Sequence, residues 1–428
     1  MIRQALARLR PRVDAARLAQ RAGDLLRRRQ DAVRVVQWAF VAVYLTLLLL
    51  PVLLPLTPVA PAVAARVARF AEIVFWGVWW PGVLLSVLLV GQFWCGVLCP
   101  DGTLTEFASR RGRGGKIPAW LRRAGWPLFG FSLLFTWEHL VDAYGRPTLV
   151  LLAVGGMTLL ALGSGLLFGR GKRVWCRYAC PAGGVFSLLS RCAVLHFKVD
   201  RAAWDAAPRP QPAPVDCPLL LDVRRLRSNE KCSMCGRCSG HRDAVALAPR
   251  APGGEIATLA AADARGLDAF AVCFVLCGLA YGVINAPGGR LHAWLSALAP
   301  ALPDWVPTLA AMLLVAAAVG SLLAALLLAA GGGARRRAQH LSYALIPLAG
   351  IGLFLGALDY AFMLLAEAGQ AVAGARAAVR GVAIAVGAAW SLSVGRALCR
   401  RSGTGGVFLA AAILGFAAVL LAAEGHIG

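Results

Sequence analysis

Long apolar stretches separated by shorter and often basic segments run through the whole chain. Each stretch approaches the roughly 20 helical residues that cross a bilayer core about 30 Å thick. Because backbone N–H and C=O groups in lipid must bond within their own segment, such stretches are helices. We predict nine membrane-spanning helices, at residues 36–56, 72–93, 126–141, 147–168, 267–287, 307–331, 341–366, 379–395 and 405–423.

The composition supports this prediction. Of the 428 residues, 59% are hydrophobic and only 15% are charged, whereas soluble domains have about 45–50% apolar and about 25% charged residues. We therefore expect an all-α polytopic membrane protein. The predicted spans divide it into a basic N-terminal segment, a four-helix membrane domain, a polar segment and a five-helix C-terminal membrane domain, at 1–35, 36–186, 187–266 and 267–428.

The positive charge is distributed unevenly along the chain. The formal net charge is +23, and 38 of the 44 Lys and Arg residues lie in alternate loops. Basic loops stay on the cytoplasmic side of a membrane, so the charge reflects topology and argues against nucleic acid as a partner. We predict a bacterial inner-membrane protein with a cytoplasmic N-terminus and a periplasmic C-terminus. The basic loops are 1–35, 94–125, 169–266, 332–340 and 396–404.

The first 34 residues contain ten Arg, together with leucines at helical spacing. Two interpretations of this segment remain open. It is either a helix that lies on anionic lipid or a solvated basic tail.

One cysteine motif occurs twice. Trp-Cys-x3-Cys-Pro-x-Gly stands at 94–102 and again at 175–183, each time where a predicted span ends on the basic side. Four thiolates from two equivalent helix ends are a complete ligand set for one 4Fe–4S cluster. Proline begins the following helix, whose N-terminal dipole favours the anionic cluster. The four thiols belong to Cys95, Cys99, Cys176 and Cys180.

A second cysteine group lies in the polar segment. Cys232, Cys235 and Cys238 are separated by two residues each, which is how the ferredoxin run C-x2-C-x2-C-x3-C-P begins. The fourth cysteine of that run is missing. Cys217, which precedes a proline, is our candidate for the remaining ligand, and His241 is the alternative. We therefore expect a small ferredoxin-like iron–sulfur segment on the cytoplasmic side.

The cysteine pattern favours metal over disulfides, because the cytosol is reducing. Eight patterned cysteines predict two 4Fe–4S clusters, although spacing leaves open how the eight divide between them. Zinc is the alternative for the triplet, but zinc sites usually use paired C-x2-C units. The remaining four cysteines are expected to be packing residues: Cys192, Cys273, Cys277 and Cys399.

A few ionisable residues lie at or within the predicted spans. Glu138 and His139 are near the outer end of the third span, Asp142 is just beyond them, and Asp359 is in the outer half of the seventh. Such residues are costly in lipid and often functional. Two interpretations remain open: a quinol site in which these groups accept protons, or polar residues at the membrane interface. His139 is also the candidate axial ligand for a haem, but we do not expect haem in this protein.

The duplicated Trp-Cys-x3-Cys-Pro motif followed by C-x2-C-x2-C resembles the membrane-bound polyferredoxins. These include the quinol-oxidising subunit of periplasmic nitrate reductase systems, the membrane domain of the nitrous oxide reductase regulator and the cytochrome oxidase accessory protein. The resemblance covers about 72–245. It implies electron transfer between the quinone pool or a cytoplasmic donor and a partner, through two 4Fe–4S clusters on the cytoplasmic face.

These patterns together predict an iron–sulfur electron-transfer protein with quinol as a candidate donor. The expected partners are membrane lipid and either a redox partner protein or the quinone pool. The alternative is a redox-sensing regulator or a metalloenzyme assembly factor, which includes a metal-ion reductase.

Overall fold

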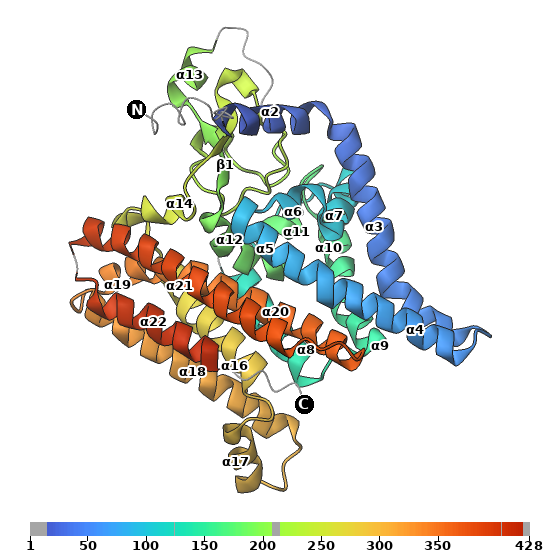
Figure 1. The fold of residues 1–428 in the computed structure, drawn as a ribbon. Helices are drawn as coiled ribbons and strands as arrows, with labels where there is room; N and C mark the ends of the chain where they lie inside the picture. The colour runs from blue at the N-terminus through green and yellow to red at the C-terminus, as the bar shows by residue number, and fades with distance from the viewer. Residues whose placement is uncertain (1–14, 124, 208–214, 404, 423–428) are drawn as a thin grey trace, which may run out of the picture.

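The fold, known from a computed structural model, is described for residues 15–123, 125–207, 215–403 and 405–422. Long helices run through most of the molecule, and a smaller segment that carries strand β1 lies at one end (Figure 1). The helices of the first half are α2 (Ala15–Arg28), α3 (Gln30–Leu53), α4 (Pro61–Glu72), α5 (Trp80–Val90), α6 (Phe93–Val97), α7 (Pro100–Arg110), α8 (Trp126–Leu140), α9 (Pro147–Val150), α10 (Gly156–Leu167), α11 (Val174–Tyr178) and α12 (Pro181–Leu189).

The second half continues with a short sheet and then long helices. Its strands are β1 (Leu195–Val199) and β2 (Val245–Pro249). Its helices are α13 (Arg201–Ala206), α14 (Gly254–Ala257), α15 (Gly266–Phe270), α16 (Ala280–Asn285), α17 (Arg290–Leu298), α18 (Trp305–Ala330), α19 (Arg335–Ser342), α20 (Ile346–Glu367), α21 (Ala373–Ser402) and α22 (Val407–Ala422). Wider π-helical turns at Ile73–Trp79, Leu151–Gly155 and Ala271–Leu279 join consecutive helices into single long stretches.

Seven helical stretches in the described part of the chain are long and apolar enough to cross a membrane. They agree with the prediction of a helical membrane protein. The seven are Gln30–Leu56, Pro61–Val90, Pro147–Leu167, Gly266–Asn285, Trp305–Ala330, Arg335–Glu367 and Ala373–Ser402.

The other two predicted spans are present as shorter helices. Helix α8 has 15 residues and α22 has 16, below the roughly 20 that cross a bilayer at 1.5 Å per residue. The count of nine spans therefore stays a prediction.

The polar segment folds around the two-stranded sheet. Strands β1 and β2 pair antiparallel, with Leu195 opposite Pro249 and Val199 opposite Val245. Their inward side chains, such as Phe197 and Leu247, form a small core of their own with the buried Met234 of the cysteine triplet.

The N-terminal helix α2 packs against this segment. A side chain at Gly23 would have no room, because a Cβ there would lie 2.8 Å from the Ser239 hydroxyl and 2.9 Å from Leu247. Arg27 donates a 2.8 Å hydrogen bond to the Ser239 carbonyl. Residues 15–28 thus lie against protein, which neither sequence interpretation included; residues 1–14 are outside the described part.

The ends of alternate spans meet on the side that carries the polar segment. At the start of α3, Gln30 donates to the carbonyl of Cys235 at 3.1 Å. Gly115, between α7 and α8, bonds to the backbone of Leu167 at the end of α10. His340 in α19 bonds to Ser402 at the end of α21 at 2.8 Å. The two cysteine motifs lie together, because residues of both line one pocket.

The N-terminal and C-terminal membrane helices share one hydrophobic core. Helix α20 packs against α5, and a Cβ at Gly350 would lie 2.9 Å from Leu88 and 3.0 Å from Leu189. Leu88 and Leu189 are fully buried in that core together with Leu348. The C-terminal block is thus packed directly on the helices that carry the motifs.

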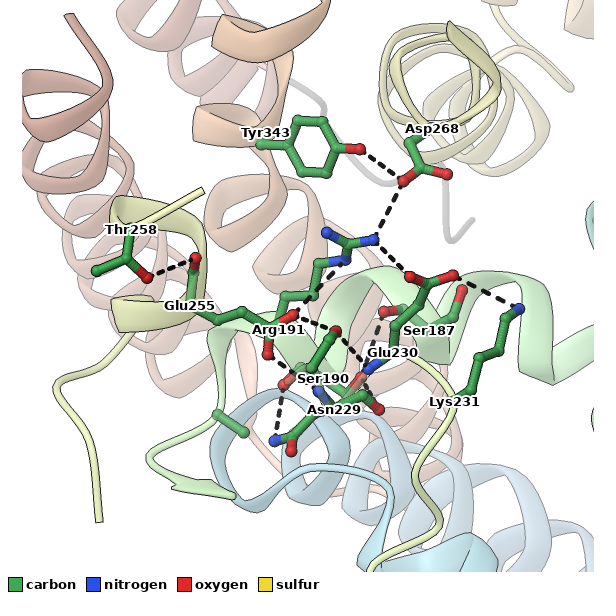
Figure 2. Close-up of polar contacts among 12 residues, drawn as sticks. Ser187, Ser190, Arg191, Asn229, Glu230, Lys231, Glu255, Thr258, Asp268 and Tyr343 are labelled. Atoms are coloured by element: carbon green, nitrogen blue, oxygen red, sulfur yellow. Dashed lines mark hydrogen bonds and ion pairs between the residues drawn. The ribbon is translucent and has the colours of Figure 1, made fainter. Parts of the chain in front are cut away.

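A buried ion network joins the polar segment to the C-terminal block. Arg191, only 4% exposed, lies between Glu230 and Asp268 at 2.8 and 3.2 Å (Figure 2). Its guanidinium also stacks over the ring of Tyr343, which donates a 2.6 Å hydrogen bond to Asp268. Glu230 lies two residues before Cys232, so the network holds in place the backbone that leads into the cysteine triplet.

We expect Arg191→Met to lower the free energy of unfolding by about 3–5 kcal/mol, because it leaves buried carboxylates without their partner. Denaturant unfolding in detergent measures this. The control is Arg225→Met, whose exposed side chain pairs with exposed Asp222 and should change stability by less than about 1 kcal/mol. Equal unfolding midpoints for the two variants would contradict the role of Arg191.

Candidate iron–sulfur site

The first motif turns the chain sharply at the end of a span. Helix α5 ends at Gly91, whose φ of 95° is in the left-handed region that favours glycine. Cys95 lies in α6 and Cys99 immediately precedes α7. The N–H groups of Leu98 and Cys99 both donate to the carbonyl of Trp94 at 2.9 Å.

The second motif repeats this geometry. The N–H groups of Ala179 and Cys180 both donate to the carbonyl of Trp175 at 2.9 Å. Cys176 lies in α11, and Cys180 precedes α12 with Pro181 in its first turn. The sequence repeat is therefore also a repeat of backbone structure.

The four thiols of the two motifs line one pocket. Burial raises the pKa of the Cys176 thiol, and the thiols of Cys180, Cys99 and Cys95 raise it further. Burial raises the pKa of Cys99 to about 11, opposed by the Gly102 N–H and the Arg173 guanidinium. That N–H reaches the Cys99 sulfur at 3.5 Å. Such donors and charges favour thiolates, the form that binds iron.

Two arginines, Arg173 and Arg177, also line this pocket. In the described part of the chain, neither Nη2 of Arg173 nor Nη1 of Arg177 has a hydrogen-bond acceptor, although both atoms are buried. Buried donors beside four thiols suit an anionic iron–sulfur group, so the residues present fit a 4Fe–4S cluster.

The second cysteine group also gathers four thiols. Burial raises the pKa of Cys238, and the thiols of Cys232, Cys235 and Cys217 raise it further. For Cys232 the pKa rises to about 12, again through burial first and with Cys235 and Cys217 contributing. Cys217, distant in sequence, packs with Cys238 against the small core that contains Cys232.

The alternative ligand His241 has different surroundings. Its ring packs against Trp204 with 5.0 Å between centroids. Burial lowers its pKa, and the guanidinium groups of Arg242 and Arg27 lower it further. Nε2 of His241 is buried and has no hydrogen-bond partner among the described residues, so Cys217 as the fourth ligand stays a prediction.

Neither group is drawn together around a single point. Among the described residues, no three Cys, His, Asp or Glu side chains lie close enough to hold one metal ion. The remaining cysteines, 192, 273, 277 and 399, are all buried in the shared hydrophobic core.

The two cysteine groups are in direct contact through their backbones. A Cβ built on Gly96 would lie 2.1 Å from the carbonyl of Ser233 and 2.9 Å from the N–H nitrogen of Cys235. Only glycine fits where the two backbones come this close. The equivalent position in the second motif is Arg177, so this contact exists on one side of the repeat alone.

The ionisable residues near the opposite end of the bundle fall into two places. His139 bonds to the Phe135 carbonyl at 2.9 Å and to the Tyr144 hydroxyl at 3.3 Å, and Glu138 beside it is 7% exposed. Asp359 instead pairs with Arg376 and Arg380 of α21, at 2.9 and 2.7 Å. The arginines therefore hold Asp359 in an ion-pair site of its own.

Comparison with known proteins bears on the motifs directly. Residues 73–124 and 150–201 each match a family model described as a 4Fe-4S binding domain. The duplicated motif is a 4Fe–4S binding motif. No curated protein and no solved structure matches the chain. The matched segments include the first group of four cysteines and leave out the second, which begins at Cys217.

We expect Gly96→Ala to separate the two groups, because the new methyl group would overlap the Ser233 carbonyl. Overpacking of this kind costs about 1–3 kcal/mol, and the protein should bind less iron per chain. Iron and sulfide analysis after anaerobic purification measures this. Gly82→Ala is the control, since a Cβ there meets nothing within 4 Å; equal iron content in the two variants would contradict the contact.

Proposed function

We propose that the chain is a membrane electron-transfer protein with two 4Fe–4S clusters. Cys95, Cys99, Cys176 and Cys180 hold the first, and Cys217, Cys232, Cys235 and Cys238 hold the second. The observation that carries this proposal is that the four cysteines of the duplicated 4Fe–4S motif line one pocket. Cys217 and Cys238 pack against the small core that contains Cys232, which supports the second set. Each bound cluster supplies reversible one-electron chemistry.

The chain's own groups prepare these thiols for iron. Backbone N–H groups at the start of α7 and α12 lower the thiol pKa values of Cys99 and Cys180, against the larger effect of burial. The guanidinium of Arg173 lowers those of Cys95 and Cys176 in the same sense. These groups stabilise negative charge on sulfur.

The charge pattern supports a cytoplasmic position for both clusters. The loops that carry most of the Lys and Arg residues are the same loops that hold the eight cysteines. In this orientation the N-terminus is cytoplasmic and the C-terminus is periplasmic, in the inner membrane of a bacterium. The segment 187–266 then acts as a ferredoxin-like unit between two membrane domains.

Quinol is the donor that we propose. Glu138 and His139 lie on α8. Gly130 of the same helix packs against Pro181, because a Cβ built on Gly130 would lie 3.3 Å from Cγ of Pro181. Eight residues separate Gly130 from Glu138, which is about 12 Å along a helix. A buried carboxylate and imidazole at this distance from the second motif can take the protons that leave an oxidised quinol.

The cluster assignment predicts about eight iron and eight sulfide per chain after anaerobic purification. We expect Cys235→Ala, which lacks any donor atom, to remove one low-potential EPR signal and leave the other. Cys399→Ala, a buried cysteine outside both groups, is the control and should keep both signals. Zinc in place of iron, or two unchanged signals in Cys235→Ala, would refute the assignment.

For the donor, we expect Glu138→Gln to slow cluster reduction by a soluble quinol about 100-fold, the usual contribution of a proton acceptor. Reduction by dithionite should stay unchanged. Glu367→Gln, an exposed carboxylate near the same end of the bundle that pairs with Arg69, is the control. A quinol rate equal to that of the control would exclude Glu138 as the acceptor.

A further inference from the structure

Arg173 occupies the space between the two cysteine groups. Its side chain is only 1% exposed. Nη1 donates to the carbonyl of Cys95 at 2.8 Å, and the backbone N–H donates to the carbonyl of Pro218 at 2.7 Å. One residue therefore bonds to the backbone of the first group and to the residue that follows Cys217.

Burial lowers the pKa of the Arg173 guanidinium, but Glu106 and the thiols of Cys176 in the first group and Cys235 in the second raise it. Nη2 has no acceptor in the described part of the chain and is buried, while Arg173 lines the pocket of the first group. A buried donor without an acceptor costs about 1–3 kcal/mol, and a sulfur of an anionic group in that pocket would satisfy it.

The carboxylate of Glu106 holds Arg173 in place, but it is shared among three arginines and so does not neutralise them all. Glu106 accepts from Nε of Arg173 at 2.8 Å, and also from Arg237 at 2.6 Å and Arg110 at 2.7 Å. Burial would raise the pKa of Glu106, but the arginines outweigh it and lower the pKa to about 2. Three guanidinium groups around one carboxylate leave net positive charge at the boundary between the two groups.

The repeat shows that this arginine is particular to one copy. The equivalent position before the first motif is Gln92, a neutral residue that donates instead to the carbonyls of Asn229 and Glu230. Space for Arg173 is provided by Gly102, where a Cβ would lie 3.0 Å from Nη1. The buried arginine at this position is therefore a feature of the second copy, which also bonds to Pro218 beside Cys217.

We propose that Arg173 is a shared positioning residue that raises the reduction potentials of both clusters together. This inference rests on the proposed function. Reduction adds negative charge to a cluster, and a nearby buried cation stabilises the reduced form most where water is excluded. Because Arg173 contacts both groups, its loss should move both potentials in the same direction, which a residue of one group alone would not do.

The test is an anaerobic redox titration of the full-length protein, followed by EPR. Arg173→Gln, which introduces the residue of the other repeat, should lower both midpoint potentials by about 59 mV or more, a tenfold change in a one-electron equilibrium. Arg173→Lys, which keeps the charge, should lower them less. Arg110→Gln, which removes another partner of Glu106 from an outer position 49% exposed, should move neither.

Glu106→Gln gives an independent test of the same charge. It removes the carboxylate and keeps the arginines, so both potentials should rise. Three results would overturn the inference. The first is that Arg173→Gln changes neither midpoint potential or only one of them. The others are that Arg173→Lys or Arg110→Gln lowers the two potentials as much as Arg173→Gln does. Should Arg173→Gln fail to bind iron, unchanged or lower potentials in Glu106→Gln overturn it.

This outcome is distinct from a failure of the proposed function. If wild-type protein shows two EPR signals and no substitution at Arg173 changes their midpoint potentials, only this inference fails. Wild-type protein without those signals would end the proposed function.

Discussion

Negative charge buried beside a membrane must be compensated within the protein, and the end of the bundle that carries the cysteines is built around this requirement. Thiolates that bind iron are anionic, and burial disfavours them strongly. The compensation comes from backbone N–H groups at the starts of α7 and α12 and from the guanidinium of Arg173. Glu106, itself buried, holds that guanidinium between the two cysteine groups.

The first cysteine group is built from two equivalent motifs, whereas its contacts with the second group depend on positions where the two motifs differ. Both motifs use the same backbone bonds to a tryptophan carbonyl, so their thiols arrive at one pocket in equivalent ways. The second cysteine group contacts the two copies in different ways. Gly96 of the first copy allows a close backbone approach to Ser233 where the second copy has Arg177. Arg173 of the second copy bonds to the carbonyl of Pro218 where the first copy has Gln92. The asymmetry of the repeat is thus where the two groups are coupled.

Features with a strong local pattern could be predicted from the sequence. Apolar stretches of span length predict membrane helices wherever they occur, and seven of them have the required length and composition. The motif at Cys95 and Cys176 predicts iron because its spacing and surroundings are specific. The proline after Cys217 predicts that this residue is the fourth ligand of the second group, and Cys217 packs against the small core that contains Cys232.

Features that depend on packing between distant segments could not be predicted. Arg173 and Arg191 stand in basic loops among many similar arginines, and only the fold shows that these two are buried. Helix α2 was expected on lipid or in water, since nothing local shows that Gly23 fits against Ser239. The packing of α20 against α21 pairs Asp359 with Arg376, which no sequence pattern reveals.

The central claim is that eight thiols form two adjacent four-iron sites, and EPR of the fully reduced wild-type protein tests it most directly. We expect about two unpaired electron spins per chain, with spectra split or broadened by magnetic interaction between neighbouring clusters. One spin per chain, or two signals without any mutual interaction, would contradict it.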